Sequence, residues 1–253
     1  MNALLPQLVR AMASPNAQPA SRNWLLQALS SADLALIGPD LERVDLPRRK
    51  QLEYPNRIFD SVYFVERGIA SVVARTESTE VEVGVIGREG VTGIPVILGN
   101  DRSANSTYMQ VSGEGQRLPV SALRAAFKRS DTLHALLLRY VQAFMAQTAG
   151  TVVANAKATL DERLARWLLM ASDRLDSNSF ELTHEFLALM MGTRRPGVTE
   201  SIHVLSRQGL IRAERGLITI ADRDGLRERA GKFYGTAESE LKRLISYKER
   251  AGK

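Results

Sequence analysis

The sequence predicts an α+β protein in which an antiparallel β-roll, a long helix and a winged helix-turn-helix follow one another along the chain. Three observations support this fold class. Short apolar runs with a period of two, separated by glycine turns, occupy much of the first half, as is typical of antiparallel strands. An unbroken helical pattern then extends from about residue 132 to residue 158. Residues 182–220 have the pattern of a helix, a tight turn, a second helix and a short hairpin.

The stretch 182–220 is the most informative part of the sequence. One face of its second helix is apolar at i, i+4 and i+7, which are Val198, Ile202 and Leu205. Gly192 supplies the backbone freedom that a turn between crossed helices needs, and Gly209 ends the second helix. Apolar residues on both sides of residues 214–216 predict a two-stranded wing. This order indicates a winged helix-turn-helix, which places its second helix in the major groove of DNA.

The opposite face of that second helix is polar and supports the same interpretation. It carries Pro196, Glu200, His203 and Arg207, with Arg194, Arg195 and Thr199 near the N-terminal end. A proline is compatible with the first turn, because no intrahelical N–H bond is lost there. A solvated amphipathic helix in an ordinary helical domain would show the same pattern by itself. The turn and the wing in the right order favour DNA binding over that alternative.

Composition sets broad limits on the function. A chain of 253 residues is long enough for two domains, and 34 basic against 28 acidic residues give a net charge of +6, which mildly favours a polyanionic partner. The absence of cysteine excludes disulfides, thiolate metal sites and cysteine nucleophiles. Pro6 interrupts the apolar residues of the N-terminus, so we expect no signal peptide. Without an apolar run long enough for a membrane span, a soluble cytoplasmic protein is expected.

The strand pattern lies between a helical start and the long helix. The predicted strands are Val62–Val65, Ile69–Val73, Val81–Ile86 and Tyr108–Val111, and the first two are separated by a turn at Arg67-Gly68. A helical pattern covers residues 23–39, and another covers 118–127. The predicted organisation is a flexible tail at 1–22, a β-roll at 23–130, the long helix at 131–158, the winged helix-turn-helix at 159–222 and a helical extension of unclear role at 223–253.

The long helix carries more apolar surface than one neighbour would cover, which favours a partner helix. The alternative is a long helix that lies on its own domain. The first interpretation predicts a homodimer joined through a seam of apolar and small side chains. That predicted seam consists of Leu133, Leu137, Tyr140, Val141, Phe144 and Thr148.

Three segments together resemble the Crp/Fnr family of bacterial transcription regulators, over about residues 25–222. They are VYFVERGIASVV, RLARWLL and LTHEFLALMMGTRR…VTESIHVLSRQGLI. The resemblance implies a cyclic-nucleotide-binding-like sensor domain and a homodimer paired through the long helices. It also implies two DNA-binding domains that read an inverted repeat. The implied partners are double-stranded DNA, a second copy of the chain and RNA polymerase, with no membrane.

The family's nucleotide cassette is only partly present. In GIPVILGNDRS, Gly93 fits the cassette glycine, and Arg102 with Ser103 fits the pair that binds the cyclic phosphate. Ile94 stands where cyclic-AMP-binding members have a glutamate that accepts a bond from the ribose hydroxyl. Thr148 matches the long-helix position near the base. We therefore expect no fixed cofactor and an effector other than cyclic AMP, either a small anion or another nucleotide. Alternatively, Arg102 only pairs with a nearby acid such as Asp101 or Glu89.

Other sensor chemistry has less support in the sequence. An iron–sulfur sensor needs several cysteines, and there are none. A haem sensor needs an axial ligand, for which the candidates are His134 and Met109, and no further pattern supports either.

The resemblance also assigns roles within the helix-turn-helix. The base-reading positions fall on Arg195, Pro196 and Glu200, with Thr199 beside them, and Thr183 falls on the position that contacts phosphate. Arginine can donate two bonds to guanine, glutamate can accept from cytosine, and proline offers only apolar contact, such as to a thymine methyl. Contacts to the DNA backbone are assigned to Arg194, Arg207, Arg212 and Arg215.

Two other function classes have less support in the sequence than a DNA-binding regulator. An enzyme is disfavoured, because no phosphate-cradling loop, paired histidine motif or nucleophile elbow is present. The second rival is a cyclic-nucleotide-binding regulatory protein that acts through protein contacts. Such a protein needs no exposed recognition helix, so the winged helix argues against it.

Overall fold

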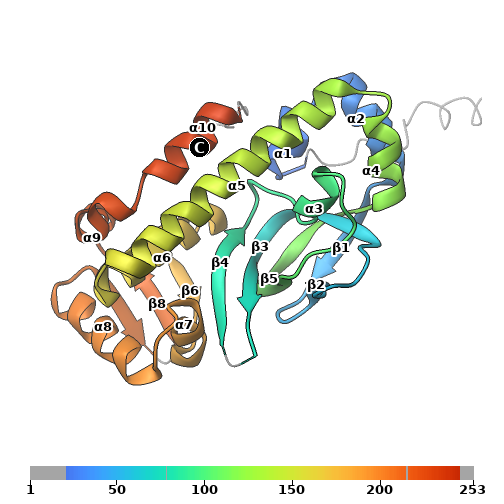
Figure 1. Cartoon of the computed structure of the whole chain (residues 1–253). Helices are drawn as coiled ribbons and strands as arrows, with labels where there is room; N and C mark the ends of the chain where they lie inside the picture. Colours follow the sequence, from blue (N-terminus) through green and yellow to red (C-terminus); the bar gives the residue numbers. More distant parts are fainter. Residues whose placement is uncertain (1–20, 78, 215, 246–253) are drawn as a thin grey trace, which may run out of the picture.

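The computed structural model describes residues 21–77, 79–214 and 216–245. The predictions that concern residues 1–20 of the tail, Arg215 and residues 246–253 of the extension lie outside the described residues. Figure 1 shows a β-roll at one end of a long helix, a helical domain with a small sheet at the other end, and a C-terminal helix that lies alongside the long helix. The α+β class and the order of the parts are as predicted.

The roll is an antiparallel sheet with strand order β1-β5-β3-β4, in which β2 also pairs with β5. Its strands are β1 (Glu42–Leu46), β2 (Gln51–Glu53), β3 (Ser61–Arg75), β4 (Glu80–Ile86) and β5 (Ser106–Pro119). The short helix α3 (Ile94–Ile97) lies between β4 and β5, and α4 (Val120–Phe127) follows β5. The strands β1 and β2 were not predicted, because their polar residues give no clear alternation.

The prediction of a turn at Arg67-Gly68 is wrong, because β3 continues through these two residues as one strand. The register with β5 shifts around Arg67, and Gly68 adopts φ +88°. A glycine with positive φ and a local shift in register are the features of a β-bulge. The glycine therefore bends a long strand at this point and does not reverse the chain.

The predicted N-terminal helix is broken into two short helices, α1 (Trp24–Ala28) and α2 (Ser31–Ile37), and a 3-10 turn, η1 (Gly38–Asp40), follows them. The break has a local cause, since Ser30 caps the second helix by accepting from the backbone N–H of Asp33 at 3.0 Å. Asn23 caps α1 and also donates to the carbonyls of Val65 and Gly90, both at 2.8 Å. This one buried amide fixes the start of the described chain to the roll.

The long helix, α5 (Asp131–Lys157), has the predicted extent. The side chains that were predicted to form the dimer seam, however, face the roll. Leu133, Leu137, Tyr140 and Val141 are at most 4% exposed in the core that the helix shares with the roll. Phe144 and Thr148 are half-buried, and the Thr148 hydroxyl donates to the Phe144 carbonyl at 3.0 Å. The seam assignment is therefore corrected, because the chain's own roll covers this apolar face and leaves a different face of α5 exposed.

The helix-turn-helix part follows α5 directly. Its elements are α6 (Leu160–Leu175), β6 (Ser179–Glu181), α7 (His184–Met190), α8 (Arg195–Arg207), β7 (Ile211–Glu214), β8 (Leu217–Ile220) and α9 (Arg223–Ala230). The wing is the predicted β7–β8 hairpin, and β6 extends it to three strands in the order β6-β8-β7. Leu226 and Ala230 of α9 are fully buried in the core of this part. The predicted boundary at residue 222 therefore falls too early, and α9 belongs with the winged helix-turn-helix.

After a 3-10 turn, η2 (Gly231–Phe233), the chain returns along α5 as α10 (Thr236–Leu244), as Figure 1 shows. Ile245 at its end is 1% exposed and joins the core of the roll and α5. The C-terminal extension therefore links the helix-turn-helix part back to the roll.

Of the helices within the described residues, none has the length and apolar character that crossing a bilayer requires.

The roll and the helix-turn-helix part also share a core. Ile69 of β3 and Val85 of β4 are buried together with residues of α6 and α7. In the same contact, Trp167 of α6 donates its indole N–H to the carboxylate of Glu82 of β4 at 2.9 Å. The two parts therefore meet through a packed apolar contact that includes this buried polar bond.

Candidate nucleic-acid interface

The helix-turn-helix is built from local features that the sequence encodes. Thr183 caps α7, and its hydroxyl accepts from the Phe186 N–H at 3.2 Å. Gly192 in the turn adopts φ +56°, which glycine accommodates more easily than other residues. Pro196 lies in the first turn of α8, where it costs no intrahelical bond. Gly209, at φ +75°, follows the last residues of that helix.

One face of α8 is fixed in the core and the other is open to solvent. Val198, Ile202 and Leu205 are at most 3% exposed, as predicted from their spacing. The opposite face is exposed at Arg194, Arg195, Pro196, Glu200, His203 and Arg207. Because the buried stripe orients the helix, these polar side chains are all presented to the same side of the molecule.

The exposed residues are linked by weak surface contacts. Arg195 pairs with Glu185 of α7 at 3.0 Å, and Arg207 pairs with Glu200 at 3.5 Å, with all four side chains more than 60% exposed. Exposed ion pairs of this kind contribute about 0–1 kcal/mol each. Both arginines can therefore leave their carboxylates for a stronger polyanionic partner at small cost.

Thr199 is held more firmly than its neighbours. Its hydroxyl donates to the Arg195 carbonyl at 3.1 Å and lies 2.8 Å from Nδ1 of His184. It is half-buried, so it positions the junction of α7 and α8 and offers less surface to a ligand. Sequence reasoning missed this pair and the Glu185 pair, because neither has a spacing signal across the turn.

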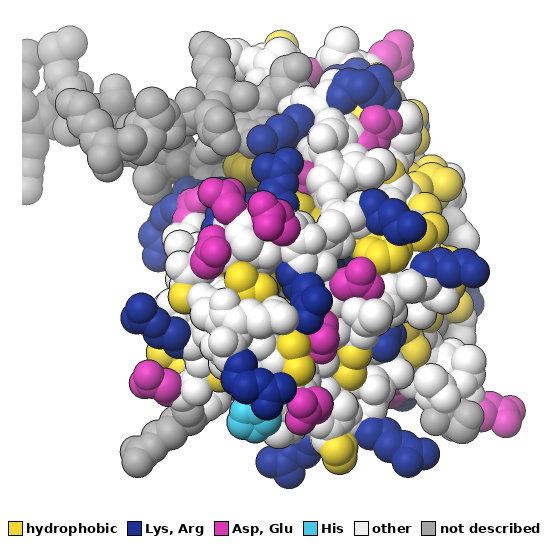
Figure 2. Space-filling model, turned by 90° about the vertical axis from the view of Figure 1, so that its left-hand side faces the viewer, with side chains coloured by type: hydrophobic (Ala, Val, Ile, Leu, Met, Phe, Trp, Pro, Cys, Tyr) yellow, Lys and Arg dark blue, Asp and Glu magenta, His cyan; other side chains and the backbone are white. Residues whose placement is uncertain are grey.

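Figure 2 views the molecule from the end that holds the helix-turn-helix. Lysine and arginine side chains stand out over this face, with acidic side chains between them. Arg212 of β7 adds an exposed arginine on the wing. The charge is mixed, so the case for nucleic acid depends on the placement of particular arginines around α8.

Comparison with known proteins agrees with this geometry. Residues 162–229 match the family described as the Crp-like helix-turn-helix domain. The chain carries a Crp-like helix-turn-helix domain. The matched range ends within α9, in accord with the burial of Leu226 in this domain. No curated protein matches the sequence.

Solved structures of Crp/Fnr regulators share the fold of about three quarters of this chain. A Crp/Fnr-family transcriptional regulator from Thermus thermophilus is 23% identical, with a TM-score of 0.60, and the match covers 76% of this chain and 100% of that one. FixK2 from Bradyrhizobium japonicum is 14% identical, with a TM-score of 0.63 and coverage of 74% and 96%. The c-di-GMP-responsive regulator CLP from Xanthomonas campestris is 16% identical, with a TM-score of 0.61 and coverage of 76% and 99%. The Crp-like domain thus follows a roll and a long helix of the Crp/Fnr type.

The predicted effector residues lie in the roll and on α5, each with a partner inside the chain. Arg102 pairs with Asp101 at 3.3 Å and its side chain is 56% exposed, which matches the alternative that it only neutralises a neighbouring acid. Gly93 donates to the buried Glu53 and begins α3, where Ile94 packs half-buried against the core. The Ser103 hydroxyl accepts from the Asn105 N–H at 3.0 Å. The cassette remains a prediction that these contacts do not strengthen.

No group of three or more metal-ligating side chains is found within residues 21–77, 79–214 and 216–245. Of the two haem-ligand candidates, Met109 is fully buried in the roll. His134 stacks on Phe127 and lies 3.0 Å from the Ile97 carbonyl.

Proposed function

We propose that this chain is a sequence-specific DNA-binding transcription regulator that acts as a homodimer on an inverted-repeat operator. The observation that carries the proposal is the recognition helix α8. Its apolar face is locked in the core, while its N-terminal half presents Arg195, Pro196 and Glu200 to solvent. That is the arrangement a helix needs to enter a major groove with its N-terminal residues against the bases.

The exposed side chains divide into base-reading and backbone-binding roles. Arg195 can donate two bonds to guanine O6 and N7, and Glu200 can accept from cytosine N4, each discriminating by about 1–3 kcal/mol. Pro196 offers an apolar contact that suits a thymine methyl. Arg194 and Arg207 flank this set and suit contacts to phosphate, as does Thr183, which is exposed at the N-terminus of α7.

A second copy of the chain fits the face of α5 that the roll leaves free. Leu138, Met145 and Val152 follow one another at intervals of seven and are 41%, 65% and 62% exposed. Gln142 and Ala149 lie between them on the same stripe and are exposed, and Ala156 follows Val152. Gln142 donates to Glu240 of α10 at 3.2 Å. Apolar residues at alternating spacings of four and three form the seam of a left-handed coiled coil. The dimer is therefore proposed through this stripe, one face away from the residues predicted from sequence.

The test is retention on duplex DNA of random sequence as a function of salt. A protein that neutralises phosphates with arginines releases counterions, so its affinity falls linearly with salt on logarithmic axes. We expect such a decline for the wild type and a shallower slope for Arg194→Ala with Arg207→Ala. Lys50→Ala, on the roll, is the matched control and should leave the slope unchanged. A protein that does not bind duplex DNA at low salt would contradict the proposal.

A further inference from the structure

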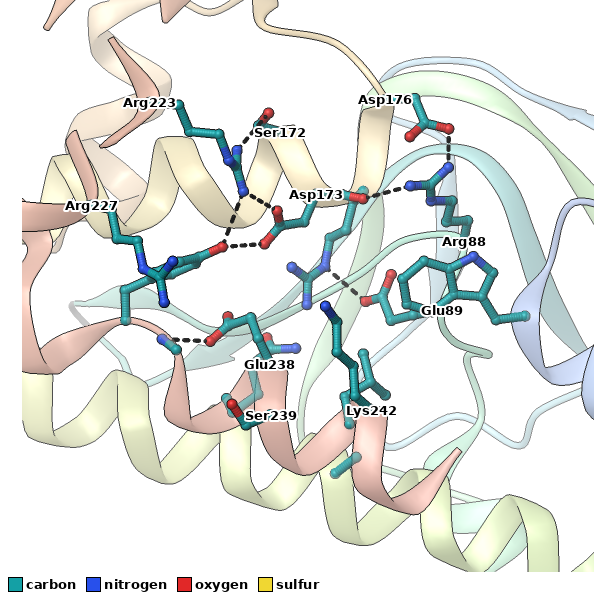
Figure 3. A pocket seen from close by; sticks show the side chains of 18 of the residues that line it. Arg88, Glu89, Ser172, Asp173, Asp176, Arg223, Arg227, Glu238, Ser239 and Lys242 are labelled. Atoms are coloured by element: carbon teal, nitrogen blue, oxygen red, sulfur yellow. Dashed lines mark hydrogen bonds and ion pairs between the residues drawn. The ribbon is translucent and has the colours of Figure 1, made fainter. Parts of the chain in front are cut away.

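A cavity of about 600 Å³ lies where the roll, α5, α6 and the C-terminal extension meet. It is separate from the cassette residues and from the exposed face of α8, and Figure 3 shows its polar side chains converging from several elements. Cavities of this size at a junction between domains are typical of small-molecule sites. Nothing described so far assigns it a role.

The cavity has an apolar wall. Tyr140, Ala143 and Phe144 of α5 line one side, and Trp24 of α1 lines the end next to the roll. Tyr140 is 2% exposed, so its ring is held in place by the core behind it. The Arg88 guanidinium lies over the Trp24 ring, 5.2 Å from its centroid. This wall suits a flat apolar body that stacks on aromatic rings.

A buried ion pair lies at the same end. Arg174 is 6% exposed, and its Nε donates to Glu89 at 2.7 Å while one terminal amino group donates to the Met170 carbonyl at 2.9 Å. Its other terminal amino group has no hydrogen bond within the described chain. A guanidinium buried to this degree rarely keeps a donor idle unless a ligand or water uses it.

The charged side chains at this end balance. The cations are Arg88, Arg174 and Lys242, and the carboxylates are Glu89, Asp176 and Glu238. Glu89 and Asp176 are each already paired with an arginine. Figure 3 shows Lys242 extending from α10 toward Glu89. Among the described residues no acid lies within ion-pair distance of the Lys242 amine. The Lys242 amine is therefore available to pair with an anion inside the cavity.

We propose that this cavity binds a small organic anion with a flat apolar body. The anionic group lies between Lys242 and the idle amino group of Arg174, and the ring lies against Tyr140 and Phe144. The site does not depend on the proposed DNA binding. Because its walls come from the roll, α5, α6 and α10, a ligand there stabilises the present arrangement of these parts. Any effect of the ligand on DNA affinity rests on the proposed function.

The test is isothermal titration calorimetry of the full-length protein without DNA, with phenylacetate and guanosine 5′-monophosphate as probes. The two probes share a ring and an anion and distinguish a carboxylate from a phosphate. We expect at least one to bind saturably with a sub-millimolar dissociation constant. Lys242→Gln should weaken it roughly tenfold, the loss of about 1.4 kcal/mol.

The matched control is Arg243→Gln, which removes the same charge from the next residue of α10. Arg243 lies outside the cavity and its side chain is 62% exposed. Both residues are exposed, so both variants should fold, as circular dichroism can verify. The proposal is overturned if neither probe binds the wild type, or if both variants bind it alike. Either failure leaves the DNA-retention result untouched, because no DNA is present.

Discussion

The buried carboxylate of Glu82 should make the stability of this protein depend on pH. Glu82 is 4% exposed at the contact between β4 and α6. It accepts from the Ser71 hydroxyl at 2.5 Å and from the Trp167 indole N–H at 2.9 Å. Burial raises the pKa of Glu82 from 4.5 to about 7, even though these two hydrogen bonds favour the ionised form.

The sign and size of the effect follow from that shift. Between the unfolded pKa of 4.5 and the folded value of about 7, the folded protein holds a proton that the unfolded chain has lost. The free energy of unfolding therefore falls as pH rises through this window. A difference of about 2.5 pKa units corresponds to about 3 kcal/mol at most. Glu82→Gln keeps the shape and removes the charge, so it should stabilise the protein by up to that amount above pH 7.

The assay is urea unfolding of the wild type and Glu82→Gln, followed by circular dichroism across this range of pH. The two proteins should be nearly equal in stability below the unfolded pKa and diverge as pH rises. Glu77→Gln removes a carboxylate that is exposed on the same hairpin, and its difference from the wild type should stay constant. If the gap between the wild type and Glu82→Gln does not change with pH, the burial argument is refuted.

Three further predictions concern the dimer, a domain boundary and a bulge. Met145→Glu places a charge on the exposed α5 stripe and should give a monomer by light scattering, whereas Arg139→Glu, exposed on the same helix, should not; a monomeric wild type would contradict the proposed seam. Leu226→Ala should lower the free energy of unfolding by about 2–5 kcal/mol, since this side chain is 0% exposed, and a loss well under 1 kcal/mol in chemical denaturation would place α9 outside the core. Gly68→Ala should destabilise by more than about 1 kcal/mol, because φ is +88° and a Cβ would lie 2.5 Å from the Val111 carbonyl oxygen; an unchanged midpoint would show that the bulge relaxes freely.

Local patterns predicted the helix-turn-helix well. The spacing of Val198, Ile202 and Leu205 gave the buried face of α8, and Gly192 gave the turn, because both features depend only on neighbours in the chain. The same local reasoning was ambiguous at Gly68, since a turn and a bulge both use a glycine with positive φ. Only pairing with the distant β5 decides between them.

The long helix shows why faces are harder to predict than elements. Leu137 and Leu138 are adjacent and equally apolar, yet the first is 2% exposed and the second 41%. Both faces of α5 carry apolar residues, and the sequence does not say which face meets the roll. The apolar stripe that was predicted to meet a second copy of the helix therefore packs against the roll of its own chain.

The remaining features come from residues far apart in the sequence. Glu82 and Trp167 bond across the contact between the roll and α6, and no spacing rule joins them. The cavity brings Trp24 at one end of the described chain together with Lys242 at the other. Such sites depend on how the domains pack, which periodicity and turn signals do not encode.

The most direct test of sequence-specific DNA binding is selection of bound duplexes from a random pool by the wild type, Arg195→Ala and Arg212→Ala. We expect the wild type to enrich an inverted repeat with half-sites about one helical turn apart. Arg195→Ala should lose a G·C preference at one symmetric pair of positions, whereas Arg212→Ala, on the exposed wing, should keep the motif and bind all sequences more weakly. An unchanged motif with Arg195→Ala would show that Arg195 contacts phosphate and does not read a base. A wild type that enriches no motif would contradict the account as a whole.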